Sequence, residues 1–330
     1  MFSRIYIEEE ILHHERTKEI LKRFSNAEQI VCAHHSEVFN PSSQNFRLQK
    51  ANPSLILAKK ANRFVHQAPD AYRIGPYHNY YFSHMMNCIY DCRYCFLQGM
   101  YRSAHHVLFV NYEDFLEQIT ATAATHNEDV AFFSGYDCDS LALEPVTHFA
   151  KYFTPKIMEI PNALLELRTK STQIRHLLDL PANPRCIVAF SISPEEVVKN
   201  TEFKTPSLKK RIDAICKLQE NGWTVGLRFD PIIYFDGYED VYKNMFNHIF
   251  NEINTEALHS VSLGVFRMPD KFFKNLIKMH PQENIFSAPF ESINGLTSYK
   301  QDLESKIISY CEQQLLNYVP AKKYFRCIDV

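Results

Sequence analysis

Runs of apolar residues alternate along the chain with segments whose apolar residues recur every three or four positions. From Tyr80 onward the two patterns take turns, which predicts strands alternating with helices on a parallel sheet. The predicted strands, rich in β-branched residues, are Asp129–Gly135, Leu164–Lys170, Cys186–Ser193, Thr224–Ile233 and Val261–Met268. The predicted helices are Tyr112–Thr125, Val146–Tyr152, Thr172–Leu180, Ser207–Asn221, Tyr238–Asn254 and Pro269–His280.

A further strand is expected just before Cys88, which makes six strand–helix units. Six units are too few for a closed eight-stranded barrel. We therefore expect an α/β fold with an open (β/α)6 partial TIM-type barrel over residues 76–281. Residues 1–75 read as an N-terminal extension with a polar helix at Glu15–Phe24. Residues 282–330 read as a C-terminal helical tail that packs on the barrel, with one helix at Ser298–Leu316.

Composition indicates a globular protein of ordinary polarity. The chain has 330 residues, of which 45% are hydrophobic and 22% are charged, and no apolar run is long enough to span a membrane. The net charge of −2 provides no global basic field, so an enzyme acting on nucleic acid would need a local basic face. Nine cysteines without a secretory signal at the N-terminus predict a reducing, cytoplasmic environment.

Three of the cysteines lie in one short run. Cys88, Cys92 and Cys95 have the spacing C-x3-C-x2-C, with Tyr94 just before the third. Iron–sulfur clusters are bound by cysteine thiolates in such runs. A four-iron cluster with three protein ligands leaves one iron free for a substrate or cofactor. This spacing is the signature of radical S-adenosylmethionine (SAM) enzymes, and it predicts one-electron chemistry.

A zinc site is the main alternative for these cysteines. His84 lies four residues before Cys88, so it could complete a Cys3His tetrahedron. The protein would then be a zinc-stabilised nucleic-acid-binding protein without catalysis. Structural zinc sites usually pair two ligand knuckles across a longer loop, whereas these ligands form a single run. The pattern therefore favours the cluster.

Polar residues follow the predicted strands. In parallel barrels, functional residues lie at the C-terminal ends of the strands. Capping of a strand end is the ordinary explanation for any one such residue, but polar groups at every end indicate a site. After the cluster loop, the polar strand ends are Ser134–Asp139, Arg168–Ser171, Ser191–Pro194, Arg228–Pro231 and Phe266–Arg267.

Several segments of the chain, within about residues 72–281, resemble the spore photoproduct lyase family of the radical SAM superfamily. The cysteine spacing by itself indicates only the superfamily, and the residues around it and the order of later segments indicate the family. These segments are Tyr94–Gln98, Val110–Phe115, Thr147–His148, Thr169–Lys170, His176–Asp179, Phe190–Ser193 and Asn221–Gly226.

The resemblance implies repair of photodamaged thymines in DNA. Family members reductively cleave SAM at a [4Fe-4S] cluster, and the resulting 5′-deoxyadenosyl radical abstracts a hydrogen atom from a methylene-bridged thymine dimer. Fragmentation restores two thymines, and a cysteine returns a hydrogen atom. The resemblance assigns the cluster to Cys88, Cys92 and Cys95, and contacts with SAM to Asp139, Lys170 and Ser191. A flavodoxin- or ferredoxin-like electron donor is expected, and no membrane partner.

Two departures from the family pattern concern the hydrogen donor. Tyr136 stands where the family has its donor cysteine, and Cys138 lies two residues later. Phe96 replaces the family tyrosine that follows the third cysteine, although Tyr94 is retained. Cys138, Tyr136 and Tyr94 are therefore the candidate catalytic residues. A radical SAM enzyme of the same fold that acts on another nucleotide or on a peptide is the alternative.

Two helices carry basic residues that could contact phosphates. Lys209, Lys210 and Arg211 open one helix, and Lys271, Lys274 and Lys278 lie on another, between apolar residues. Such a face is usually only solvated. If duplex DNA is the substrate, the damaged bases must be flipped out of the helix into the barrel mouth.

Overall fold

The structure is a computed structural model that describes residues 2–42, 44–69 and 73–327. Its centre is an eight-stranded sheet in the order β18-β14-β13-β11-β10-β9-β5-β4. All neighbouring strands in it are parallel except β4 and β5. The strands in this order are Tyr324–Arg326, Leu258–Val265, Thr224–Ile232, Cys186–Ser191, Ala163–Thr169, Val130–Ser134, His78–Phe82 and His66–Gln67.

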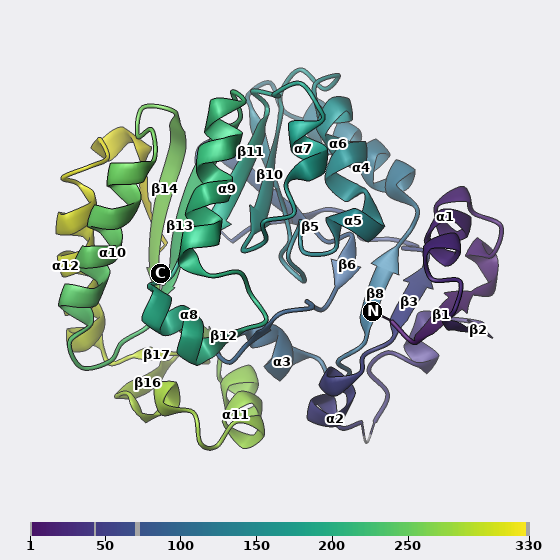
Figure 1. Cartoon of the computed structure of the whole chain (residues 1–330), viewed down its shortest axis with the longest axis horizontal. Coiled ribbons are helices and arrows are strands. Elements are labelled where there is room, and N and C mark those ends of the chain that lie inside the picture. The colour runs from purple at the N-terminus through teal and green to yellow at the C-terminus, as the bar shows by residue number, and fades with distance from the viewer. Residues whose placement is uncertain (1, 43, 70–72, 328–330) are drawn as a thin grey trace.

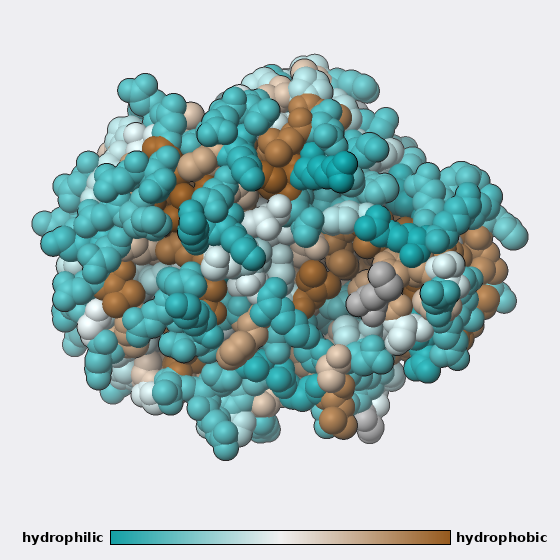
Figure 2. Space-filling view, viewed as in Figure 1, coloured by the Kyte–Doolittle hydropathy of each residue, from teal (hydrophilic) through white to brown (hydrophobic). Residues whose placement is uncertain are grey.

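The strands are apolar because both faces of the sheet are covered. All residues of β9 and β11 are buried, as expected for parallel strands under helices. Figure 1 shows the helices that connect the strands on the near face of the curved sheet. They are α4 (Tyr112–Ala124), α5 (Glu144–Thr147), α6 (Phe149–Ile157), α7 (Arg175–Leu178), α8 (Glu195–Thr201), α9 (Leu208–Glu220) and α10 (Tyr238–Glu252). The same face is largely hydrophilic, with apolar patches scattered between helices (Figure 2).

The N-terminal extension forms a sheet of its own beside the barrel (Figure 1). Its order is β2-β1-β3-β8-β6, with strands Glu28–Cys32, Arg4–Glu8, Leu55–Ala58, His106–Phe109 and Met85–Met86. Helices α1 (Glu15–Arg23) and α2 (Phe46–Ala51) belong to this part. Because β6 and β8 come from beyond residue 75, this sheet continues past the boundary expected there, and the domain division stays a prediction.

The C-terminal part is more than a helical tail. Helix α11 (Asp270–Met279) is followed by a hairpin of β16 (Phe290–Ile293) and β17 (Leu296–Tyr299), which pairs with β15 (Arg267–Pro269). Helix α12 (Gln301–Leu315) packs mainly against β14, and β18 then adds a parallel strand beside β14.

Helix α12 also lies against α10, so the last helix and the last strand both belong to the barrel. Among the described residues, no helix is long and apolar enough to cross a membrane.

The predicted units are confirmed, with shifts at their ends. The helix expected at Val146–Tyr152 is two helices, α5 and α6, because His148 takes a left-handed conformation with φ 49° between them. The helix expected at Thr172–Leu180 shrinks to the single turn α7. The last predicted helix begins at Gln301 rather than Ser298, because residues 296–299 are a strand. The C-terminal part is therefore less helical than expected, because it also contains the strands β16, β17 and β18.

Candidate functional site: a three-cysteine cavity at the barrel mouth

The cysteine loop connects β6 to the short helix α3 (Phe96–Met100). Within it, β7 (Asp91–Cys92) pairs antiparallel with β12 (Glu202–Phe203), so that Cys92 lies opposite Glu202. The Arg93 amide extends this pairing by donating to the Thr201 carbonyl at 2.7 Å. The loop is therefore fixed on the segment between α8 and α9.

A second set of contacts fixes the loop and α3 on the α11 side. The Arg93 Nε lies 2.7 Å from Glu283 Oε1, and Gln98 Oε1 lies 2.8 Å from His280 Nε2. Asn275 donates to the Gly99 carbonyl at 2.9 Å. A β-carbon on Gly99 would lie 2.3 Å from the Phe272 carbonyl oxygen. Only glycine therefore allows α3 and α11 to approach this closely.

The loop forms one wall of a cavity of about 390 Å³. All three cysteines of the run line it, and polar residues at the ends of the barrel strands form another part of its wall. The polar residues are Ser134, Asp139, Arg168, Thr169, Lys170, Ser191, Asp230 and Arg267. The strand ends and the cysteine run, which are far apart in sequence, therefore meet at one site as expected.

The arrangement of the ligands does not suit a single zinc ion. In the described residues, the one group of three or more potential metal ligands with all ligand atoms within 4.8 Å is Glu8, His34 and His35. A tetrahedral zinc ion with Zn–S bonds of 2.3 Å would hold its sulfurs roughly 3.8 Å apart. The cysteine run is wider than that, which fits a multi-iron cluster.

His84 is not placed as a fourth ligand. Its ring is buried and stacks on Phe149, with centroids 3.7 Å apart and planes 3° apart. Burial lowers its pKa to about 3. His84 therefore packs in the core between β5 and α6. The group of Glu8, His34 and His35 is explained by hydrogen bonds, because Glu8 accepts from His35 and from the Lys59 amide.

A buried lysine lies beside the cysteine loop. Burial raises the pKa of all three thiols, that of Cys88 to about 12, and Lys50 opposes the effect at Cys88 and Cys95. Lys50 is only 5% exposed and donates to the Cys88 carbonyl at 2.6 Å. Ligation by thiolates therefore requires loss of protons, and Lys50 places a compensating cation beside the loop.

Tyr94 and Lys170 meet at a buried carboxylate. The Tyr94 hydroxyl donates to Glu202, and the Lys170 Nζ lies 3.7 Å from Glu202 Oε1. Arg211 donates to Glu202 Oε2 at 2.5 Å with both side chains fully buried. Burial alone would raise the pKa of Glu202, but the charges of Lys170 and Arg211 lower it to about 2. Arg211 is thus not the exposed phosphate contact that its place among lysines suggested.

Asp139 holds the loops after β9 and β10 together. Its carboxylate accepts bonds from the Thr169 hydroxyl at 2.6 Å, the Lys170 amide at 2.6 Å and the Leu141 and Ala142 amides. Burial raises its pKa, against these hydrogen bonds. Ser191 lines the same cavity, and its carbonyl accepts from Arg211 at 3.1 Å. The three predicted SAM contacts are therefore neighbours in one wall.

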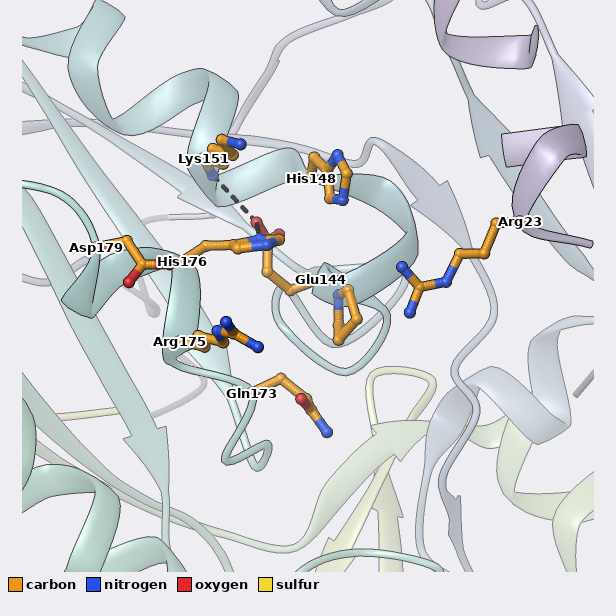
Figure 3. A pocket seen from close by; sticks show the side chains of 9 residues that line it. Arg23, Glu144, His148, Lys151, Gln173, Arg175, His176 and Asp179 are labelled. Atoms are coloured by element: carbon orange, nitrogen blue, oxygen red, sulfur yellow. Dashed lines mark hydrogen bonds and ion pairs between the residues drawn. The ribbon is translucent and has the colours of Figure 1, made fainter. Parts of the chain in front are cut away.

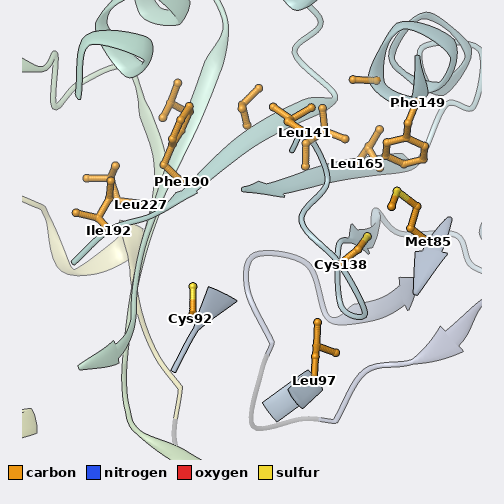
Figure 4. Packing of buried hydrophobic residues seen from close by; sticks show 14 of the residues in the cluster. Met85, Cys92, Leu97, Cys138, Leu141, Phe149, Leu165, Phe190, Ile192 and Leu227 are labelled. Atoms are coloured by element: carbon orange, nitrogen blue, oxygen red, sulfur yellow. The ribbon is translucent and has the colours of Figure 1, made fainter. Parts of the chain in front are cut away.

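The two candidate hydrogen donors face different surroundings. The Tyr136 ring is 48% exposed, stacks on Tyr81 at 4.4 Å and lies 5.5 Å from the ring of Phe96. Cys138 is buried, and its thiol points toward Met85 among apolar side chains (Figure 4). Both residues line the cavity, but Tyr136 presents its side chain beside the residue that follows Cys95.

Arg228 is one of the predicted strand-end residues that do not line the cavity. It is 1% exposed inside the barrel and donates to Glu166 Oε2 at 2.6 Å and to Ser260. Its guanidinium lies over Gly226, where a β-carbon would meet it at 2.9 Å. Arg228 therefore belongs to a deeper layer of the barrel than Asp230, and it holds the strands together.

Sequence reasoning missed the apolar wall of the cavity, Lys50 and Glu202. Tyr81, Phe133, Phe272 and Leu296 line the cavity from four different elements. They read as ordinary core residues in the sequence, and Lys50 and Glu202 read as ordinary charged residues. Only the alternation within each strand could have indicated which rings face inward.

An α/β partial barrel with three cysteines open to a polar cavity at its mouth is the arrangement expected of a radical SAM enzyme. The family model for spore photoproduct lyase matches residues 1–284. Spore photoproduct lyase of Bacillus subtilis (strain 168) is 27% identical over 243 residues, which are 72% of this chain and 69% of that protein. The Clostridium acetobutylicum enzyme is 23% identical over 248 residues, 72% of this chain and 71% of its own. The chain belongs to the spore photoproduct lyase family.

Solved structures agree in fold. A mutant of spore photoproduct lyase with bound AdoMet and dinucleoside spore photoproduct is similar with a TM-score of 0.86 at 19% identity, covering 100% of this chain and 99% of that one. Spore photoproduct lyase complexed with the dinucleoside spore photoproduct gives a TM-score of 0.83 at 19% identity, with 99% and 98% covered. The open partial barrel is thereby confirmed.

Proposed function

We propose that this protein is a radical SAM lyase that repairs a thymine photoproduct in DNA. The observation that carries the proposal is the meeting of the C-x3-C-x2-C loop with the polar strand ends around one cavity of about 390 Å³. Membership of the spore photoproduct lyase family supports the reaction type. The substrate of the solved relatives, a dinucleoside spore photoproduct, supports the substrate class.

Cys88, Cys92 and Cys95 would hold a [4Fe-4S] cluster, which when bound supplies the electron that cleaves SAM into methionine and a 5′-deoxyadenosyl radical. Lys170 would pair with the methionine carboxylate or a ribose oxygen of SAM, and Ser191 would donate a hydrogen bond. Asp139, whose oxygens already accept bonds from Thr169 and Lys170, would act mainly by keeping these two loops in place.

The apolar part of the wall would receive the damaged bases. The aromatic residues Tyr81, Phe133 and Phe272 line the cavity, and bases stack favourably on aromatic rings. The exposed lysines of α11, Lys271, Lys274 and Lys278, would contact the phosphates beside the flipped bases. Exclusion of water by this wall would protect a carbon radical from side reactions.

Tyr136 is the proposed hydrogen donor. Its phenol would give a hydrogen atom to the thymine product radical, forming a C–H bond and leaving a tyrosyl radical. One electron from the low-potential reductant and one proton from solvent would then restore the phenol. The exposure of Tyr136 to the cavity beside Phe96 favours it over Cys138, whose thiol faces Met85 (Figure 4). Tyr94, buried against Glu202, would support the cluster loop.

The test is an anaerobic assay of the full chain reconstituted with iron and sulfide. Dithionite and SAM are added, and 5′-deoxyadenosine and repaired thymine are quantified with and without DNA that carries the spore photoproduct. We expect cofactor cleavage in both cases and repair only with the damaged DNA. Cys95→Ala should abolish both, whereas Cys216→Ala, remote from the cavity, should abolish neither.

The assay also separates the alternatives. Cofactor cleavage without repair would retain the radical SAM class and reject the thymine photoproduct, in favour of another nucleotide or a peptide. Tyr136 at the position of the family's donor cysteine is the observation that favours this second candidate. A colourless protein that binds zinc and cleaves no SAM would reject the enzyme. The proposal includes a flavodoxin- or ferredoxin-like electron donor and a cytoplasmic setting.

A further inference from the structure

A second cavity lies on the other side of the loops that position Asp139 and Lys170. It has a volume of about 410 Å³ and shares no lining residue with the cysteine cavity. The loop after β9 runs from Asp139, in the first cavity, to Glu144, in the second, and the loop after β10 runs from Lys170 to Gln173 and Arg175. The two sites are therefore separated by two short segments of chain.

Cations from three elements surround this second cavity. Arg23 comes from α1 of the N-terminal extension, Lys151 from α6 and Arg175 from α7. In Figure 3 the guanidinium groups of Arg23 and Arg175 point into the same space in front of Glu144. His148 and His176 line the cavity between them, with ring centroids 4.9 Å apart.

The inner side of the cavity is fixed by a buried carboxylate. Glu144 is 1% exposed and accepts bonds from the Ala150 amide at 2.9 Å and the Lys151 amide at 3.1 Å. Its Oε1 also lies 3.0 Å from His176 Nδ1. The contact at Nδ1 fixes the orientation of the His176 ring, and within the described residues its Nε2 makes no hydrogen bond.

The charges of the cavity do not balance. Within the described part of the chain, no carboxylate lies within 4.0 Å of the side-chain nitrogens of Arg23, Lys151 or Arg175. Glu144 is occupied by His176 and two amides, and Asp179 lies at the edge opposite Arg23 (Figure 3). Burial lowers the pKa of His148, and the charges of His176, Lys151 and Arg23 lower it further, against the carboxylate of Glu19, which raises it. Cations gathered in a concave surface attract an anion.

Two segments that carry the family resemblance contribute to this cavity. His148 follows Thr147, and His176 begins the segment that ends at Asp179. Neither histidine lines the cysteine cavity, so the proposed repair reaction gives them no role. An anion site accounts for both, because each is held at the surface between cations.

We propose that the cavity formed by Arg23, His148, Lys151, Arg175 and His176 binds a phosphate group. Guanidinium groups present paired donors that match phosphate oxygens, and two of them from different elements can bind one phosphate from opposite sides. The volume of about 410 Å³ exceeds what a phosphate alone needs, so the phosphate would carry an organic group. A free nucleotide and the terminal phosphate of a nucleic acid share this chemistry.

Isothermal titration of the reconstituted full chain tests the proposal, with three probes: inorganic phosphate, ATP, and a short oligothymidylate with or without a 5′-phosphate. The double variant Arg23→Gln/Arg175→Gln removes the two guanidinium groups. The matched control is Lys22→Gln/Lys217→Gln, which removes the same charge, once on the same helix α1 and once on α9. We expect binding to the first variant to be at least about tenfold weaker, and binding to the control to be unchanged.

Each possible result either supports or overturns the proposed phosphate site. Binding of ATP but not of the 5′-phosphorylated oligothymidylate at this site supports the proposal with a free nucleotide as the source. A gain from the 5′-phosphate that disappears in the Arg23→Gln/Arg175→Gln variant supports it with a nucleic acid end. Equal loss in the control variant, or no binding of any probe to the unaltered protein, overturns it. Cleavage of SAM should be the same in both variants, which keeps this test apart from that of the repair reaction.

Discussion

Glu202 and Arg211 form an ion pair at 2.5 Å in which neither side chain is exposed to solvent. The pair joins two elements that the site depends on. Glu202 is paired across β12 and β7 with Cys92 and accepts from the Tyr94 hydroxyl, whereas Arg211 lies on α9 and donates to the Ser191 carbonyl. The cysteine loop is thereby connected to the barrel through a buried charge pair.

Replacing Glu202 by glutamine should destabilise the protein by about 3 kcal/mol at pH 7, because Arg211 loses its buried counter-charge. Unfolding by urea, followed by circular dichroism, measures this. Glu196→Gln is the control, since Glu196 is an exposed neighbour on α8. A loss in Glu202→Gln no larger than in Glu196→Gln would show that the pair does not stabilise the fold.

The same pair predicts a dependence of stability on pH. The pKa of Glu202 falls from 4.5 to about 2 in the folded protein, and that of Glu166, beside Arg228 and Arg168, does the same. A carboxyl with a lowered pKa stabilises the fold above its unfolded pKa, so this stability is lost as the pH falls from 4.5 toward 2. Each group accounts for about 3 kcal/mol. Glu202→Gln should therefore lose less stability on acidification than the unaltered protein, measured as urea unfolding from pH 7 to pH 3.

Tyr136 and Cys138 can be separated by two conservative changes. Tyr136→Phe keeps the ring on Tyr81 but removes the transferable hydrogen, so we expect thymine repair to fall at least about tenfold while SAM cleavage continues. Cys138→Ala should retain most of the repair. The measurement is thymine release per 5′-deoxyadenosine formed. The reverse result would assign the donor to Cys138, and full repair in both variants would place it elsewhere.

Lys50→Met should make the cluster harder to reduce. The buried ammonium beside the Cys88 carbonyl favours the added electron, so its loss should lower the reduction potential by on the order of tens of millivolts. A redox titration followed by electron paramagnetic resonance measures the change. Lys22→Met, on the exposed side of α1, is the control. An unchanged potential would mean that Lys50 acts only through its hydrogen bond.

Gly99→Ala should separate α3 from α11. The new methyl group would lie 2.3 Å from the Phe272 carbonyl oxygen, so we expect a loss of about 2 kcal/mol or more together with poorer retention of iron. Gly237→Ala is a useful comparison, because nothing lies within 4 Å of its β-carbon but φ is +81°. That change should cost about 1 kcal/mol from backbone strain alone and leave iron content unaltered.

The alternation of strands and helices was predictable because each strand of the barrel is buried on both faces and each helix on one. β9, β10, β11 and β13 lie where apolar runs predicted them, whereas β14 begins at Leu258, before the predicted Val261, and the end of the predicted run falls in β15. β18 escaped prediction because its three residues gain their order from β14, more than sixty positions earlier. The two-residue strands β7 and β12 likewise have no period of their own, since each is defined by the other from a distant part of the chain.

The sequence was enough to predict that the cysteines and the strand ends form the site, but not which charged residues around it are buried. The sequence places Arg228 and Asp230 on the same face of β13, yet only Asp230 reaches the cavity, because Arg228 is paired with Glu166 inside the barrel. The buried roles of Glu202, Arg211 and Lys50 depend on contacts between distant segments. A charged residue in a charged segment carries no local sign that it is buried.

The cysteine loop is held by residues that come much later in the chain. Arg93 is bonded to Glu283, 190 positions on, Gln98 to His280, 182 positions on, and Tyr94 to Glu202, 108 positions on. A nascent chain that has emerged only as far as its own cysteines has none of these anchors. For a cluster bound by Cys88, Cys92 and Cys95, we therefore expect delivery of iron and sulfide to follow synthesis of α11 rather than to accompany translation of the ligands themselves.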